Sequence, residues 1–173
     1  QAIAADAANN SQIASQKVKT EALTTAQYTE YLPKYGASAA AISNNGRWVV
    51  GANDRYGFVL DLSKDEIVEF TAAEFYDVAD DGTAVGSNHE TNPDGNAAIL
   101  IGDKMVEIDL SSVAVKHGMS CATGITPDAT YIVGWYWEYD EANSYFAQQY
   151  GAVIPFCYDV LKDRVTIPTE GER

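Results

Sequence analysis

The sequence has few basic residues and no long apolar run. Its 173 residues contain 11 Lys and Arg against 25 Asp and Glu, which gives a formal net charge of −14. Nucleic acids and anionic membrane surfaces are bound by clustered Lys and Arg, so this charge balance argues against both as partners. No apolar run approaches the roughly 20 residues that a membrane-spanning helix needs. We therefore expect no nucleic-acid binding and no membrane span.

Cysteine and histidine are equally scarce. The chain has two of each, Cys121 and Cys157 together with His89 and His117. Two cysteines are too few for a disulfide-stapled scaffold, and they lack the spacing of metal ligands. Neither histidine stands in a motif with a nucleophilic Ser or Cys, and no phosphate-binding glycine loop occurs. The sequence predicts no cofactor and no metal site, and it favours a protein without catalysis.

What the chain does contain is an internal repeat. Residues 42–51, 78–86 and 125–134 each begin with a β-branched residue, pass a polar turn and end with an apolar run closed by Gly. Asn-Gly and Asp-Gly supply the positive φ angles of a tight hairpin, so each segment predicts two antiparallel strands. The turn pairs are Asn45-Gly46, Asp81-Gly82 and Asp128-Ala129.

A second hairpin follows each of the first ones, with turns at Lys64-Asp65, Gly102-Asp103 and Lys162-Asp163. A repeating four-stranded antiparallel unit of about 40 residues is typical of a β-propeller blade. We therefore predict an all-β fold with three propeller blades. The expected boundaries are an N-terminal leader or linker at 1–36 and propeller repeats at 37–173, with blades at about 38–72, 73–113 and 118–170.

Three blades do not close a ring, since propellers have about four to eight. Open sheet faces and edges are avoided in native proteins. Three arrangements would protect them: a longer natural chain, assembly of two copies, or coverage by the N-terminal segment. We favour the first, which predicts assembly with further blades or subunits.

The first repeat resembles a known family. Residues 39–51 carry Ile-Ser, Gly and Val-Gly in order, and Gly57-Phe58-Val59 follows where the family often has His-Ala-Phe. This pattern is similar to the HAF-type extracellular repeat of secreted bacterial proteins. The resemblance covers residues 38–168, and it implies a secreted or surface-exposed protein, with the periplasm as the alternative, and no catalytic residues. The first residue, Gln1, fits a cleaved signal segment or a trimmed N-terminus.

The loops between the second and third strand of each unit vary in length. From the closing Gly to the turn Asp the distance is 14 residues in the first unit, 17 in the second and 29 in the third. In propellers these loops share one face with the connections between blades, and insertions on such loops are where function concentrates. We therefore expect a binding surface on that face.

The longest of these loops, residues 135–151, holds seven of the 19 aromatic residues of the chain and three acids. Exposed aromatic side chains beside carboxylates stack on sugar rings or anchor protein interfaces. The alternative is that they pack on one another and on the neighbouring blade, a role that we expect for Trp135. The candidate ligand- or partner-binding residues here are Trp137, Tyr139, Asp140, Glu141 and Tyr145.

The corresponding loop of the second unit, residues 87–96, adds His89 and Asn92 as candidates. It lacks the spacing of a calcium loop, so its Asn and Asp residues are expected to form turns. The cysteines should lie on strands separated by a third strand, about 9–10 Å apart, which predicts two unpaired buried thiols.

These observations lead to one expectation with two alternatives. The first is a non-catalytic, secreted or surface-exposed module that binds a glycan or protein partner through its expanded loops. One alternative is a structural subunit of a larger surface complex. The other is part of an enzyme whose catalytic residues lie in further blades.

Overall fold

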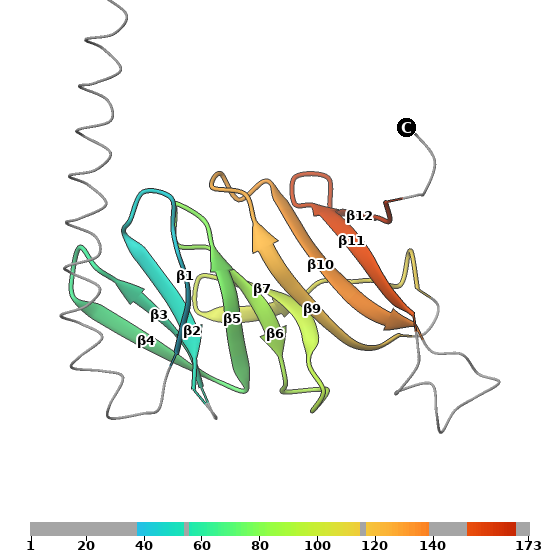
Figure 1. Ribbon diagram of the computed structural model, residues 1–173, viewed down its shortest axis with the longest axis horizontal. Helices are drawn as coiled ribbons and strands as arrows, with labels where there is room; N and C mark the ends of the chain where they lie inside the picture. Colours follow the sequence, from blue (N-terminus) through green and yellow to red (C-terminus); the bar gives the residue numbers. More distant parts are fainter. Residues whose placement is uncertain (1–37, 54–55, 115–116, 139–151, 169–173) are drawn as a thin grey trace, which may run out of the picture. The chain divides into compact units, whose positions relative to one another are not determined.

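The computed structural model describes residues 38–53, 56–114, 117–138 and 152–168. These residues form three four-stranded antiparallel sheets, one from each repeat (Figure 1). Strand order in every sheet follows the chain, so each strand pairs with its neighbours in sequence. For these residues the predicted all-β fold and its four-stranded units are confirmed, whereas their assignment to a β-propeller stays a prediction.

The twelve strands match the repeats in order. The first sheet contains β1 (Ser38–Ile42), β2 (Trp48–Ala52), β3 (Tyr56–Asp61) and β4 (Glu66–Thr71). The second sheet contains β5 (Ala73–Val78), β6 (Ala84–Asn88), β7 (Asn96–Ile101) and β8 (Lys104–Glu107). The third sheet contains β9 (His117–Ile125), β10 (Tyr131–Glu138), β11 (Val153–Asp159) and β12 (Arg164–Thr166).

The turn between the first two strands has the same conformation in all three sheets. Its fourth residue is in the left-handed region, with φ of 71° at Gly46, 95° at Gly82 and 57° at Ala129. Glycine adopts this conformation without strain, whereas alanine does not. Of these three residues, Ala129 is therefore the one whose backbone conformation destabilises the folded state.

The glycine that closes the second strand is required by close backbone contact. A β-carbon would lie 2.0 Å from the Ser38 carbonyl oxygen at Gly51, 1.8 Å from that of Glu74 at Gly86, and 2.2 Å from that of Cys121 at Gly134. The first strand of each sheet also has a register irregularity near this contact. The repeated glycine therefore lets the irregular first strand of each sheet approach the second strand.

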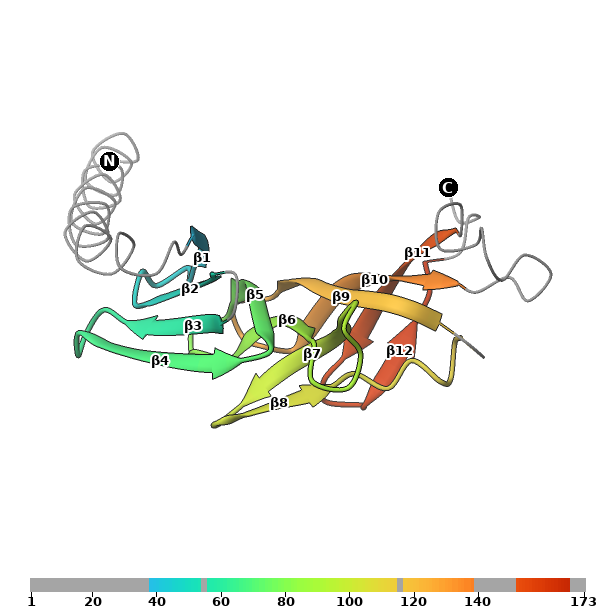
Figure 2. The same ribbon diagram turned by 90° about the horizontal axis from the view of Figure 1, so that it is seen from below.

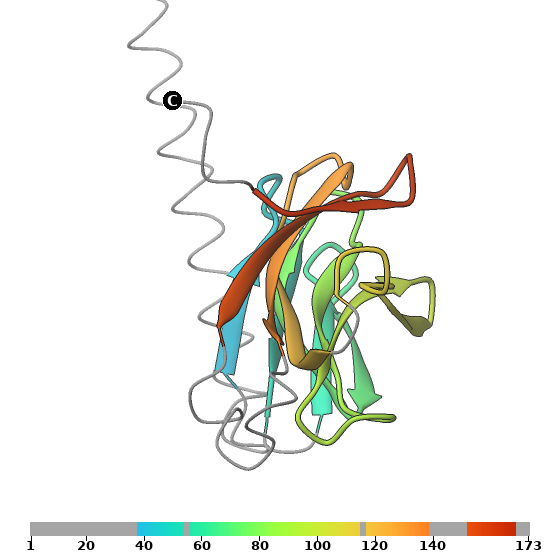
Figure 3. The ribbon, with the colours of Figure 1, turned by 90° about the vertical axis from the view of Figure 1, so that its right-hand side faces the viewer.

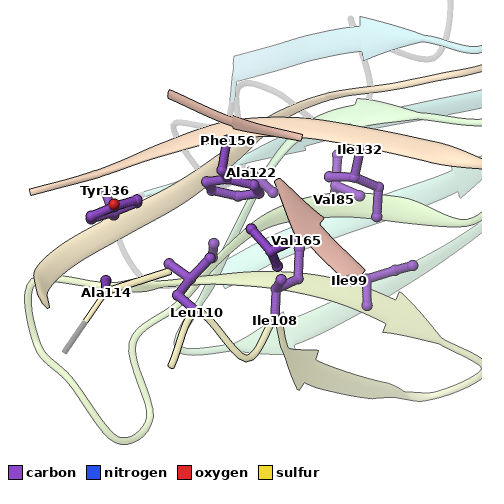
Figure 4. Close-up of a cluster of buried hydrophobic side chains, with 11 residues drawn as sticks. Val85, Ile99, Ile108, Leu110, Ala114, Ala122, Ile132, Tyr136, Phe156 and Val165 are labelled. Atoms are coloured by element: carbon purple, nitrogen blue, oxygen red, sulfur yellow. The ribbon is translucent and has the colours of Figure 1, made fainter. Parts of the chain in front are cut away.

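The sheets pack face to face through apolar side chains. Val50 and Val59 of the first sheet share a buried cluster with Ala84 and Leu100 of the second. A second cluster joins the other face of the second sheet to the third sheet (Figure 4). Its members are Val85, Ala97, Ile99, Ile108, Leu110, Ala114, Ala122, Ile132, Tyr136, Phe156 and Val165.

Hydrogen bonds link the first turns of successive sheets. The Asn45 backbone N–H donates to Asp80 Oδ1 at 2.7 Å, and the Asn45 side-chain amide donates to the Asp80 carbonyl at 2.8 Å. The Asp80 N–H in turn donates to the Pro127 carbonyl at 2.9 Å. The first turn is thereby tied to the second and the second to the third, which fixes the three sheets relative to one another at this end.

Candidate functional site

The end of the second sheet opposite to these turns carries the connection between β6 and β7 and the link from β4 to β5 (Figure 2). In the second sheet the connection at 89–95 contacts the start of β9, because the Ser120 N–H donates to the Gly95 carbonyl at 3.0 Å. The last residue of β10, Glu138, pairs with His117 at the same end. We call this end, formed by residues 72–76, 88–96, 117–120 and 136–138, the loop end.

A polar cluster lies at the loop end of the second sheet. The Tyr76 hydroxyl donates to Glu74 Oε2 at 2.5 Å, and His89 Nε2 lies 3.8 Å from the same oxygen. His89 Nδ1 lies 3.0 Å from the Pro93 carbonyl, which only accepts, so Nδ1 carries a proton. In the neutral ring Nε2 is therefore an unprotonated acceptor, and it has no hydrogen-bond partner. Protonation would turn it into a donor facing the Glu74 carboxylate.

Two groups in and beside this cluster have raised pKa values. Burial, followed by the hydrogen bond to Glu74, raises the pKa of Tyr76, so its hydroxyl stays neutral. Burial also raises the pKa of the Cys121 thiol. Repulsion between a Cys121 thiolate and the Glu74 carboxylate raises this pKa further. A catalytic thiol needs the opposite shift. The cluster can therefore donate and accept hydrogen bonds, but it holds no activated thiol.

The cluster remains open to solvent. Tyr76 is 39% exposed, and the side chains of Glu74 and His89 are 43% and 25% exposed. A ligand can therefore reach the phenol ring and the carboxylate from the same side.

Among the binding residues predicted from the sequence, Asn92 stabilises the conformation of its own loop. Its amide nitrogen donates to the Gly95 carbonyl at 3.3 Å and to Asn96 Oδ1 at 3.0 Å, and its oxygen accepts from the Asp94 N–H at 3.1 Å. These bonds fill its donors and an acceptor position. Asn92 therefore shapes the loop that places His89 beside Glu74.

A neighbouring network stiffens the same loop. Glu107 Oε1 accepts from the Thr91 hydroxyl at 2.6 Å and from the Asn88 amide at 3.3 Å. The other carboxylate oxygen accepts from the Asn96 amide at 3.1 Å. The connection between β6 and β7 is thus anchored to β8 at both of its ends, which keeps the polar cluster ordered.

Trp137 lies on β10, which extends through the first four residues of the expanded segment. It is half-buried and shares a face with Trp135, which is also half-buried. The expected contrast between a packed Trp135 and an exposed Trp137 is therefore wrong. The buried aromatic residue is Tyr136 on the opposite face, 1% exposed and edge-on to the His117 ring at 6.2 Å. The other four candidates of this segment lie outside the described residues, namely Tyr139, Asp140, Glu141 and Tyr145.

Both cysteines are free, as predicted, and β10 separates their strands. Cys121 is buried, but Cys157 is half-buried, so the expectation of two buried thiols was wrong for Cys157. Cys157 lies opposite Val133 on a face of the third sheet that no other described sheet covers.

The sequence analysis missed Glu74 and Tyr76. Their signal was the alternation at the start of β5, where the buried Ala73 and Phe75 are interleaved with these two more exposed side chains. Alternation of this kind identifies a strand with one face buried and the other more exposed.

Comparison with known proteins gives no assignment. No protein-family model and no curated protein matches this chain. The resemblance to HAF-type repeats thus stays a prediction. Among the described residues, no cluster of three or more His, Cys, Asp or Glu side chains could hold a metal ion. Within those residues there is also no helix long and apolar enough to cross a membrane.

Proposed function

We propose that the chain is a non-catalytic binding module, secreted or displayed on a cell surface, whose loop end binds a glycan or a protein partner. The observation that carries this proposal is the cluster of Glu74, Tyr76 and His89, which is partly exposed on an ordered sheet end. The extracellular location rests on the resemblance to HAF-type repeats, with the periplasm as the alternative.

The chemistry of the cluster supports a ligand with hydroxyl or amide groups. The Glu74 carboxylate accepts hydrogen bonds, and hydrogen bonds to a charged group are stronger than those between neutral groups. The Tyr76 ring offers an aromatic surface with a polar tip, the combination found in sites that bind amphipathic ligands. The hydrogen bonds of Asn92 and Glu107 hold the loop in place before the ligand arrives, which lowers the entropic cost of binding.

The proposal is tested by screening the purified chain on an array of glycans and an array of purified extracellular proteins, followed by measurement of Kd for the ligands found. Glu74→Gln and Tyr76→Ala are each expected to weaken binding by about tenfold or more, because a hydrogen bond to a charged group contributes about 1.5–3 kcal/mol. Asp103→Asn removes the same charge from an exposed turn at the opposite end of the second sheet, and it should bind as the unmodified chain does.

Two results would contradict the proposal. One is a ligand whose Kd is the same for Glu74→Gln, Tyr76→Ala and the unmodified chain. The other is the absence of any ligand from both arrays for a chain that circular dichroism shows to be folded.

A further inference from the structure

The third sheet has an apolar face that no other described part of the chain covers. Figure 3 views the molecule from this side. Tyr131 is 46% exposed, Val133 49% and Val153 54%. We call this surface the outer face of the third sheet, and it consists of Tyr131, Val133, Trp135, Trp137, Val153, Pro155 and Cys157.

The repeat shows what such a face does elsewhere in the molecule. The residue before the closing glycine pairs with a residue of the third strand in every sheet: Val50 with Val59, Val85 with Ile99, and Val133 with Cys157. The first two pairs pack against the next sheet, and their four side chains are 0% to 7% exposed. Val133 and Cys157 occupy the same positions in a sheet with no successor among the described residues.

We infer that the outer face of the third sheet is a docking surface for a fourth four-stranded sheet of the same repeat. The expected contact is the one that the chain already makes twice. In the first instance Val50 and Val59 meet Ala84 and Leu100 of the second sheet. In the second, Val85 and Ile99 meet residues of β10 and β11 in the third sheet. This surface is distinct from the loop end, so the inference does not depend on the proposed ligand site.

A second copy of the chain is a poorer occupant. In the existing contact, the third sheet presents the face that carries Ile132 and Phe156. To dock in the same manner, a second copy would have to present the corresponding face of its first sheet. In the first sheet these positions are Val49 and Phe58, which are only 1% and 7% exposed. In a second copy these two positions are therefore not accessible for the same contact.

The test extends the full chain after Arg173 with a second copy of residues 73–114. This copy contains no cysteine, so the reactivity of Cys157 reports whether the outer face of the third sheet is covered. The rate at which 5,5′-dithiobis(2-nitrobenzoate) modifies Cys157 is measured in the original and the extended chain, with the buried Cys121 as the internal reference for folding. We expect the appended repeat to slow modification of Cys157 by about tenfold or more, because a covered thiol reacts far more slowly than an accessible one.

Val133→Asp in the extended chain is the matched variant. It places a charge in the middle of the expected contact, so it should restore the rate of Cys157 while Cys121 stays protected. An unchanged rate of Cys157 modification in the extended chain would overturn the inference. This holds if the appended repeat folds without docking, and also if it stays unfolded, because the outer face of the third sheet should stabilise it. Protection of Cys157 in a dimer of the original chain, detected by analytical ultracentrifugation, would also overturn it, since the occupant would then be a second copy.

Discussion

The substitution Gly86→Ala should destabilise the protein strongly although it adds only one carbon. The β-carbon would lie 1.8 Å from the Glu74 carbonyl oxygen and 2.8 Å from the carbonyl carbon. Both are backbone atoms, so β5 must move by more than about 1 Å to restore a normal contact. Forced overpacking costs about 1–3 kcal/mol, and each disrupted backbone hydrogen bond adds about 1 kcal/mol. We expect the free energy of unfolding to fall by about 3 kcal/mol or more.

The assay is urea denaturation followed by tryptophan fluorescence and circular dichroism. A loss of 3 kcal/mol moves the midpoint by about 1.5 M if the m-value is near 2 kcal/mol/M. Gly102→Ala is the control: no atom lies within 4 Å of its β-carbon, but its φ of 66° costs about 1 kcal/mol. A Gly86→Ala protein as stable as Gly102→Ala would refute the close-contact explanation of the repeated glycine.

Three further substitutions test the turns and their electrostatics. Ala129→Gly should raise the free energy of unfolding by about 0.5–1 kcal/mol in urea denaturation, because it relieves the left-handed conformation; a decrease would contradict this. Asp80→Ala should cost about 1 kcal/mol, because it removes the acceptor of the Asn45 N–H, and Asn45→Ala should also destabilise the protein, because it removes the donor to the Asp80 carbonyl; unchanged stability in both variants would deny the link between turns. The Arg47 guanidinium, bonded to both oxygens of Asp61, holds the pKa of that carboxyl well below its usual range. This stabilisation is present above the unfolded pKa of about 4 and is lost as the pH falls further, so Asp61→Asn should unfold with a shallower pH dependence below about pH 4; an unchanged acid profile would disprove it.

The repeat made the sheets predictable from the sequence. Tight-turn pairs such as Asn45-Gly46 fix the hairpin locally, and alternation of apolar residues fixes the strands, so both signals lie within a few residues of one another. The same logic failed for Trp135 and Trp137. Which of three adjacent aromatic residues is buried depends on the side to which the second sheet packs, and in the structure that side takes Tyr136. Packing between sheets is not encoded in the period of one strand.

The candidate site was less predictable than the fold. His89 was predicted from the sequence because a histidine in a long loop is conspicuous. The Glu74 carboxylate beside it lies on β5, 15 positions earlier in the chain. Asn92 was predicted for a binding role, and in the structure its side chain bonds to its own loop, to Asn96 and to the Gly118 carbonyl on β9. Asp80 stands next to the predicted turn pair Asp81-Gly82, and in the structure it also joins two sheets. These roles arise from contacts between segments that are separated in the sequence, which spacing along one segment does not reveal.

Hydrogen–deuterium exchange with and without a ligand identified on the arrays tests the central claim most directly. The account predicts slower exchange on binding at the loop end, in residues 72–76, 88–96 and 117–120. The turns at 43–47, 79–83 and 126–130, at the opposite end of the sheets, should exchange at the same rate in both states. Protection of those turns with no change at the loop end would contradict the proposed binding site.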